Sequence, residues 1–136
     1  MPHLVILYTP QLDAETDMTA LCRRLADTLR DARDEVGAVV FPIGGIRVLA
    51  YPAAHHATTD GSGDHAFCWF NLRMGRGRSA DVHRRCGEAL VAAARAHLAP
   101  LLERGRPVGL TLQVDEGAEV FDGKFGNLHP LFVKPA

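Results

Sequence analysis

Hydrophobic residues are spaced along the first half of the chain in two kinds of pattern. Residues 3–9, HLVILYT, are rich in β-branched and aromatic side chains and predict a strand. Over residues 17–36 the apolar positions recur at helical spacing, with Asp17 as the N-cap and Gly37 as the stop. The apolar stripe of this helix is Met18, Leu21, Cys22, Leu25, Leu29 and Ala32. The segment GIRVLAYPA that follows predicts a second strand, interrupted near its proline.

The second half of the chain repeats this order after a polar connector, HHATTDGSGD. Residues 65–74 predict a strand that is hydrophobic on both faces, and Ser79 is the expected N-cap of a helix over residues 80–103. Pro100 is expected to kink the last turn of that helix or to end it early, because proline removes one intrahelical donor. The predicted apolar stripe is Val82, Cys86, Leu90, Ala93, His97 and Leu101.

Two further apolar stretches complete the pattern. PVGLTLQVDE alternates as a strand, and NLHPLFV predicts a short terminal one. The resulting order predicts an α+β fold, in which two βαβ units form a four-stranded mixed sheet with two helices on one face. We expect residues 1–136 to be one domain, with halves of about 1–56 and 64–136. An oligomer is expected to cover the other, apolar face of the sheet.

Charge, the start of the chain and the cysteine pattern predict the kind of partner, the location and the state of the thiols. The chain has 15 Lys and Arg against 16 Asp and Glu, a formal charge of −1, which argues against nucleic acid or an anionic membrane as the main partner. The short apolar start lacks a charged leader and a cleavage site, so we expect a cytoplasmic protein. Cys22, Cys68 and Cys86 are odd in number and widely spaced, as expected of reduced core thiols rather than disulfides or a zinc site.

The proline directly after the initiator methionine has two interpretations. Pro2 can be only a stiff lead-in to the first strand, a position that tolerates proline. Alternatively, removal of Met1 exposes a secondary amine that acts as a general base. An α-amino group titrates at about 8 in model peptides, and burial beside cationic groups disfavours its charged form, so such an amine can be neutral at pH 7.

Four short motifs carry a resemblance to a known family: MPH at the start, FPIGGIR after the first helix, GRGRS before the second, and NLHPLF near the end. In this order they resemble the 5-carboxymethyl-2-hydroxymuconate isomerases of the tautomerase superfamily over most of the chain. The resemblance implies a homotrimer in which three four-stranded sheets enclose a central barrel, with Pro2 as the first residue of the mature chain. It also implies an isomerase without cofactor, acting on an unsaturated carboxylate from aromatic-ring degradation.

Arginines supply the positive charges that such a reaction needs. A double-bond shift in an unsaturated keto acid requires one base and cations that stabilise a dienolate, and it requires no metal. Arg47 starts a strand after two glycines, where it can bind a carboxylate, and it matches an active-site position of the family. Arg78 and Arg76, in the turn before the second helix, are candidate substrate-binding residues. Arg78 is preferred because it adjoins the helix start and matches the family's arginine before serine.

One position departs from the family pattern. Relatives often carry a second arginine two residues after Arg47, where this chain has Leu49, so the exact substrate is left open. Two alternatives therefore stand beside the isomerase. One is a pyruvate-type keto–enol tautomerase that uses the same base with fewer anion contacts. The other is a non-catalytic trimeric binding module of the same fold.

Several polar side chains are interpreted as structural. His55 and His56 are adjacent, which is poor geometry for joint metal ligation on a strand, so we expect them in a connector. His3 is expected to face away from the side to which its neighbours point. Asp122 and Lys124 are interpreted as solvated loop charges, although a trimer would allow their loop to reach a neighbouring active site.

Overall fold

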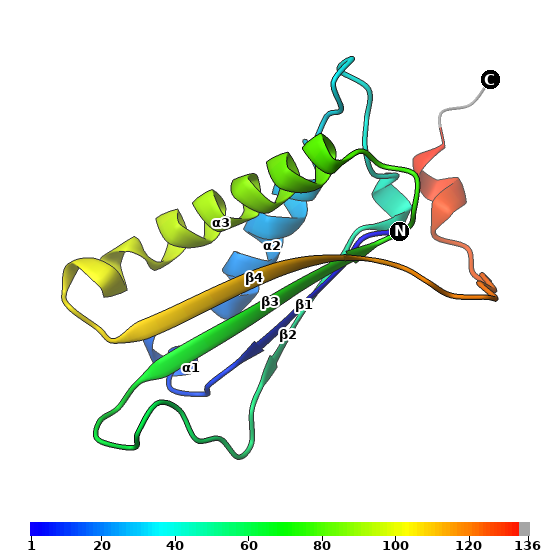
Figure 1. Cartoon of the computed structure of the whole chain (residues 1–136). Helices are drawn as coiled ribbons and strands as arrows, with labels where there is room; N and C mark the ends of the chain where they lie inside the picture. The colour runs from blue at the N-terminus through cyan, green and yellow to red at the C-terminus, as the bar shows by residue number, and fades with distance from the viewer. Residues whose placement is uncertain (134–136) are drawn as a thin grey trace.

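Two βαβ units in chain order build the protein, whose computed structural model describes residues 1–133 (Figure 1). The main elements are β1 (His3–Tyr8), α2 (Met18–Arg30), β2 (Arg47–Pro52), β3 (Ala66–Met74), α3 (Ala80–Glu103) and β4 (Val108–Glu116). Short helical turns in this part of the chain are α1 (Leu12–Glu15), η1 (Ile43–Gly45) and η2 (His129–Phe132). The four strands agree with the predicted segments to within a residue or two at each end.

The strands form a mixed sheet with the order β2-β1-β3-β4. β1 runs parallel to β2, and β3 runs parallel to β4, while β1 and β3 are antiparallel neighbours at the centre. The register places His3 of β1 between Arg47 of β2 and Arg73 of β3. Because side chains of paired residues point to the same face, three basic side chains gather at one end of the sheet.

Both helices cover the same face of the sheet, and the hydrophobic core lies between them and the strands (Figure 1). Alternate residues of the two central strands point into this core, as a pleated strand requires. They are Leu4, Ile6, Tyr8, Ala66, Cys68, Phe70, Leu72 and Met74. The helices contribute Leu21, Leu25, Leu29, Leu90, Leu98 and Leu101, among others. The predicted fold class is therefore confirmed.

The opposite face of the sheet, which we call the open face, carries large apolar side chains. Leu7, Leu49, Tyr51 and Phe67 lie on it with exposed fractions of 44%, 48%, 50% and 37%. The helices lie on the other side of the sheet (Figure 1). Half-exposed apolar residues on neighbouring strands are typical of a surface that contacts another molecule. The predicted oligomer stays a prediction here.

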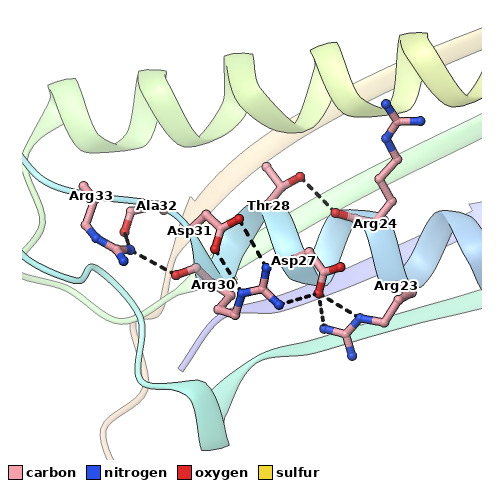
Figure 2. Close-up of polar contacts among 8 residues, drawn as sticks. All are labelled: Arg23, Arg24, Asp27, Thr28, Arg30, Asp31, Ala32 and Arg33. Carbon is pink, nitrogen blue, oxygen red and sulfur yellow. Dashed lines mark hydrogen bonds and ion pairs between the residues drawn. The ribbon is translucent and has the colours of Figure 1, made fainter.

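α2 ends at Arg30, so the expected end at Val36 is wrong. Beyond the helix, Arg33 Nη1 donates hydrogen bonds to the carbonyl oxygens of Arg30 (3.1 Å) and Ala32 (2.9 Å) (Figure 2). The Asp34 carboxylate then accepts hydrogen bonds from two amides of the following turn. These local side-chain bonds compete with the helical backbone pattern and end it, although apolar spacing continues to Ala32.

Both long helices begin at the predicted capping residues. The Asp17 carboxylate accepts a hydrogen bond from the Ala20 amide at 2.9 Å. Ser79 Oγ accepts one from the Val82 amide at 3.2 Å. Each cap satisfies one of the backbone N–H groups that a helix start leaves unpaired. The turn before α3 is thereby fixed, which matters because it carries Arg78.

Pro100 does not end α3 early, since the helix continues to its predicted end at Glu103. Leu98 and Leu101 lie on either side of the proline and are both buried, so core packing holds the last turn in place. Leu98 also takes the buried position that the sequence pattern assigned to His97. The His97 side chain is half-buried instead, and its Nε2 lies 3.1 Å from a backbone carbonyl oxygen near the start of α2.

The terminal segment NLHPLFV is not a strand, contrary to the prediction. Its residues His129–Phe132 form η2, and Pro130 stands at the start of this turn, where a missing N–H leaves no hydrogen bond unmade. We call residues 117–133 the C-terminal arm. After β4 the arm runs outward and then returns, so that η2 packs beside η1 and close to the start of the chain (Figure 1).

Two further features concern the apolar character of the helices and the state of the thiols. Within residues 1–133, no helix combines the length and the apolar character needed to cross a membrane. Cys68 and Cys86 are buried, as predicted for core thiols, whereas Cys22 is half-buried; the three thiols are free. Burial raises the pKa of the Cys68 thiol to about 12, so this thiol stays protonated in the core at neutral pH.

Candidate active site

The start of the chain is tied to the sheet by its backbone. Pro2 is buried, and its carbonyl oxygen accepts a hydrogen bond from the Arg47 amide at 3.3 Å. Met1 precedes it and is half-buried, so the Pro2 nitrogen belongs to a peptide bond and the free amine is that of Met1. Only the α-carbon and carbonyl carbon of Met1 separate the two nitrogen atoms. The surroundings of the Met1 amine are therefore close to those that a freed Pro2 amine would have.

Arg47 brings a guanidinium to this point from the first residue of β2. Its Nη1 donates a hydrogen bond to the Gly45 carbonyl oxygen at 3.2 Å and lies 3.3 Å from the Met1 sulfur. The same nitrogen lies 3.5 Å from His3 Nε2. The structure thus brings together two of the predicted site residues, Pro2 and Arg47, and adds His3 to them.

The two glycines before Arg47 allow both the start of the chain and the C-terminal arm to approach η1. A Cβ atom at Gly44 would lie 3.0 Å from Nδ1 and 3.1 Å from Cα of His129. A Cβ atom at Gly45 would lie 3.0 Å from Cγ of Met1. Both glycines are buried, so a side chain at either position would displace a neighbour.

Arg78 is held in place by its own contacts and does not line the cavity described below. Its Nη1 donates to the Gly75 carbonyl oxygen and its Nη2 to the Val40 carbonyl oxygen, each at 3.1 Å. The guanidinium lies over the ring of the buried Phe41. These contacts use part of its hydrogen-bonding capacity and leave other N–H groups for an anion. The residue is half-buried and acts electrostatically on the amine of Met1, as shown below.

Arg76 has a different position from Arg78, although both belong to the same turn. Its side chain is exposed, and its Nε donates a hydrogen bond to the Gly117 carbonyl oxygen at 2.9 Å. Arg76 therefore anchors the first residue of the C-terminal arm. A role in substrate binding for Arg76 stays a prediction.

A cavity of about 410 Å³ opens between the start of the chain and the C-terminal arm. Met1, His3 and Arg47 line it from the sheet side, and Asp122 and Lys124 line it from the arm. The Lys124 Nζ atom lies 3.1 Å from Asp122 Oδ2. The cavity thus combines the amino end of the chain with several positive charges and one paired carboxylate.

Burial and charge both act on the amine at the start of the chain. Burial lowers the pKa of the Met1 amine below its ordinary value, and this is the largest cause. The positive charges of Arg78, Lys124 and Arg47 lower that pKa further. The negative charge of Asp122 opposes them. The environment therefore favours a neutral amine, which is the form that can accept a proton.

His3 experiences a similar environment. Burial is the main cause that lowers the pKa of its imidazole, followed by the charge of Arg47. The terminal amine and Arg73 lower the pKa of His3 further. The ring is consequently neutral at pH 7 and can accept or donate a hydrogen bond at the cavity wall.

Sequence reasoning missed how much of the cavity the C-terminal arm supplies. Asp122 and Lys124 are exposed charges of an irregular segment, as predicted, and both also line the cavity beside Met1. No periodic pattern signals where an irregular segment folds back. For His3 a signal existed, because a strand that begins at residue 3 and pairs with one that begins at Arg47 places these two side chains together.

The sheet order, the helices on one face and the basic cavity at the chain start define a protein with a tautomerase-like fold. A solved structure named "Q0 fused 4-OT wild type symmetric trimer" shares this fold at 23% sequence identity, with a TM-score of 0.54 and coverage of 96% of both chains. This similarity establishes the fold alone. A search of curated proteins gave no significant match.

Two solved structures with higher sequence identity identify the family within this fold. A crystal structure of 5-carboxymethyl-2-hydroxymuconate delta-isomerase is 59% identical, with a TM-score of 0.94, over 100% of this chain and 95% of that one. A 5-carboxymethyl-2-hydroxymuconate isomerase from Deinococcus radiodurans R1 is 32% identical, with a TM-score of 0.84, over 98% and 95%. The sequence profile of the 5-carboxymethyl-2-hydroxymuconate isomerases matches residues 2–132. The chain belongs to this isomerase family, as its motifs predicted.

Proposed function

We propose that this protein is a cofactor-free isomerase that shifts a double bond in an unsaturated keto or hydroxy carboxylic acid from aromatic catabolism. The Pro2 amine would act as the general base. One observation carries the proposal: the amino end of the chain lies at a cavity where burial and the charges of Arg78, Lys124 and Arg47 lower the pKa of the Met1 amine, one residue before the Pro2 nitrogen. Membership in an isomerase family supports the reaction class.

Removal of Met1 has two effects on the site. It converts the Pro2 nitrogen from an amide into a secondary amine, whose ring fixes the direction of the lone pair. It also removes the thioether that lies 3.3 Å from Arg47 Nη1, so that this guanidinium can turn to a substrate oxygen. The unprocessed chain is therefore inactive in our proposal, because an acylated proline nitrogen is not basic.

The reaction needs one base and two kinds of anion contact. The neutral Pro2 amine takes a proton from the 2-hydroxyl oxygen of a dienol substrate, or from a carbon of a keto substrate, and the electron pair passes into a dienolate. Arg47 donates hydrogen bonds to the oxygen on which this negative charge develops. The prolyl ammonium then returns the proton to a different carbon, which completes the shift. Arg78 disfavours the ammonium form by its charge, and Arg78 and Arg76 are the proposed contacts of a substrate carboxylate.

We further propose that the chain forms one domain and assembles as a homotrimer through the open face. The half-exposed Leu7, Leu49, Tyr51 and Phe67 support contact with other copies. The trimer number follows from the resemblance to the family. Light scattering coupled to size exclusion measures the mass directly, and a monomer at micromolar concentration would contradict this part of the proposal.

The base is tested by mass spectrometry and a single variant. The intact mass of the active protein is expected to lack Met1. Pro2→Ala keeps an α-amine but changes its basicity and rigidity, so turnover of an unsaturated 2-hydroxy acid is expected to fall at least roughly a hundredfold. Undiminished turnover of this variant, or an active preparation that retains Met1, would overturn the proposed base, whereas a chain that retains Met1 and shows no turnover would favour the non-catalytic binding module.

Leu49 favours a second candidate function. It lies on the open face of β2, as does Arg47, and it adds no positive charge at the position where relatives often have arginine. A pyruvate-type keto–enol tautomerase needs fewer anion contacts than a dicarboxylate isomerase. Comparison of substrates that carry one carboxylate with substrates that carry two separates these functions.

A further inference from the structure

The C-terminal arm supplies a positive charge to the cavity, on the side opposite the sheet. Lys124 and Asp122 line the cavity from the arm, while Met1, His3 and Arg47 line it from the sheet. The charge of Lys124 acts on the Met1 amine and lowers its pKa, second only to Arg78 among the charged groups. Lys124 is therefore part of the electrostatic environment of the amine.

The ion pair of Lys124 is of a kind that a ligand can replace. Its Nζ lies 3.1 Å from Asp122 Oδ2, and the two side chains expose 54% and 52% of their surfaces. Exposed pairs of this type contribute little to stability, because water and salt screen them. An incoming carboxylate of the same charge can therefore take the place of Asp122 at small cost. Asp122 would hold the lysine in position until then.

The other basic groups at this end of the sheet are paired elsewhere or already have a role in the proposed function, in which Arg78 and Arg76 contact one substrate carboxylate. Arg47 lies against the start of the chain and is the proposed contact of the developing enolate. Arg73 pairs with Glu119 at 3.0 Å. Leu49 adds no charge to the open face of β2. A substrate with a second carboxylate thus finds its counter-charge on the arm.

We propose that Lys124 binds the second carboxylate of the substrate, in exchange for Asp122, and thereby makes the site selective for dicarboxylates. This inference rests on the proposed function, because it assumes that the substrate occupies the cavity beside Pro2. It assigns to the C-terminal arm the charge that Leu49 does not provide. It also favours the dicarboxylate isomerase over the pyruvate-type tautomerase.

The test compares 2-hydroxyhexa-2,4-dienedioate with 2-hydroxypenta-2,4-dienoate, which lacks the terminal carboxylate. At pH 9, where the amine is neutral with or without the lysine charge, Lys124→Gln is expected to raise KM for the dicarboxylate roughly tenfold, and to change KM for the monocarboxylate and kcat for both less than about twofold. Lys124→Arg should retain most of the preference, since it keeps the charge. Arg23→Gln is the matched control, because Arg23 is an exposed cation that pairs with Asp27 on α2 (Figure 2).

Calorimetric binding of hexanedioate and hexanoate separates this inference from the proposed reaction, because it requires no turnover. The wild-type protein is expected to bind hexanedioate more tightly, and Lys124→Gln is expected to remove that preference. If Pro2→Ala abolishes turnover while Lys124→Gln leaves both preferences unchanged, the base stands and the role of Lys124 is wrong. A wild-type protein with no preference for hexanedioate also overturns this role, whatever the outcome for Pro2.

Discussion

The guanidinium carbon of Arg78 lies 4.9 Å from the centre of the Phe41 ring. Phe41 is fully buried, so the ring forms a rigid apolar platform under a charged group. Hydrogen bonds to the carbonyl oxygens of Gly75 and Val40 complete the support. The position of Arg78 relative to the amine is therefore set by the core and not by the substrate.

Phe41→Leu is expected to lower both stability and activity. The smaller side chain leaves space in the core and removes the ring from beneath Arg78, at a cost of about 1–2 kcal/mol in the free energy of unfolding. Urea denaturation measures the first effect, and kcat/KM should fall as well. Phe121→Leu is the control, because Phe121 is exposed on the C-terminal arm and does not line the cavity. Equal stabilities of the two variants would contradict the proposed support.

The pH dependence of kcat/KM should report the charge of Arg78. A nearby positive charge disfavours the protonated amine, so removing it by Arg78→Gln raises the pKa of the amine. The rising limb of the profile then moves to higher pH, and activity falls more at pH 6.5 than at pH 9. Arg84→Gln, on the exposed side of α3, should leave the limb in place. A limb that does not move, or moves to lower pH, would argue against an amine as the base.

Gly44→Ala should loosen the C-terminal arm. Its Cβ would lie 3.1 Å from the backbone Cα of His129, a contact that flexible side chains cannot relieve. Hydrogen exchange over residues 117–133 is expected to become faster, and kcat/KM for a dicarboxylate should fall several-fold. Gly87→Ala is the control, because its Cβ meets Val114 at an ordinary 3.6 Å within a helix. Unchanged exchange in Gly44→Ala would show that the arm does not depend on this contact.

Glu15→Gln should destabilise the protein at the end of the sheet opposite to the site. Glu15 Oε1 lies 2.8 Å from Arg106 Nε, and the Arg106 side chain is only 9% exposed. Loss of the carboxylate leaves the guanidinium with Asp64 as its remaining carboxylate partner, at 3.3 Å, which costs about 1–2 kcal/mol. Glu88→Gln breaks an exposed pair with Arg84 and should cost less than about 0.5 kcal/mol. Thermal unfolding measures both, and kcat of the folded protein should not change.

Local patterns in the sequence were enough to predict the sheet and its two covering helices. Alternation identified the strands, and the short polar side chains of Asp17 and Ser79 marked the helix starts. The end of α2 was missed because apolar spacing continues to Ala32, whereas the side-chain bonds of Arg33 and Asp34 end the helix. Periodicity reports burial, and it does not report such local competition.

Only the part of the site that local sequence patterns determine could be predicted. Arg47 follows two glycines at a strand start, and a strand start is visible in the sequence. Lys124 and His129 reach the cavity only because the C-terminal arm folds back onto η1, and this path depends on contacts between residues far apart in the chain. Arg78 and Arg76 share one turn, but the sequence of that turn does not show that Arg78 binds the Val40 carbonyl oxygen and Arg76 the Gly117 carbonyl oxygen.

The contact between the Met1 sulfur and Arg47 has a practical consequence for anyone who prepares the enzyme. In our proposal, a purification tag or any residue left ahead of Pro2 would give a folded but inactive protein, because a residue before Pro2 is not part of the sheet or the core. Batches would then differ in specific activity according to how completely the host's aminopeptidase acts. A tag at the C-terminus would follow the arm that lines the cavity, so a cleavable N-terminal tag whose removal leaves Pro2 as the first residue is preferable.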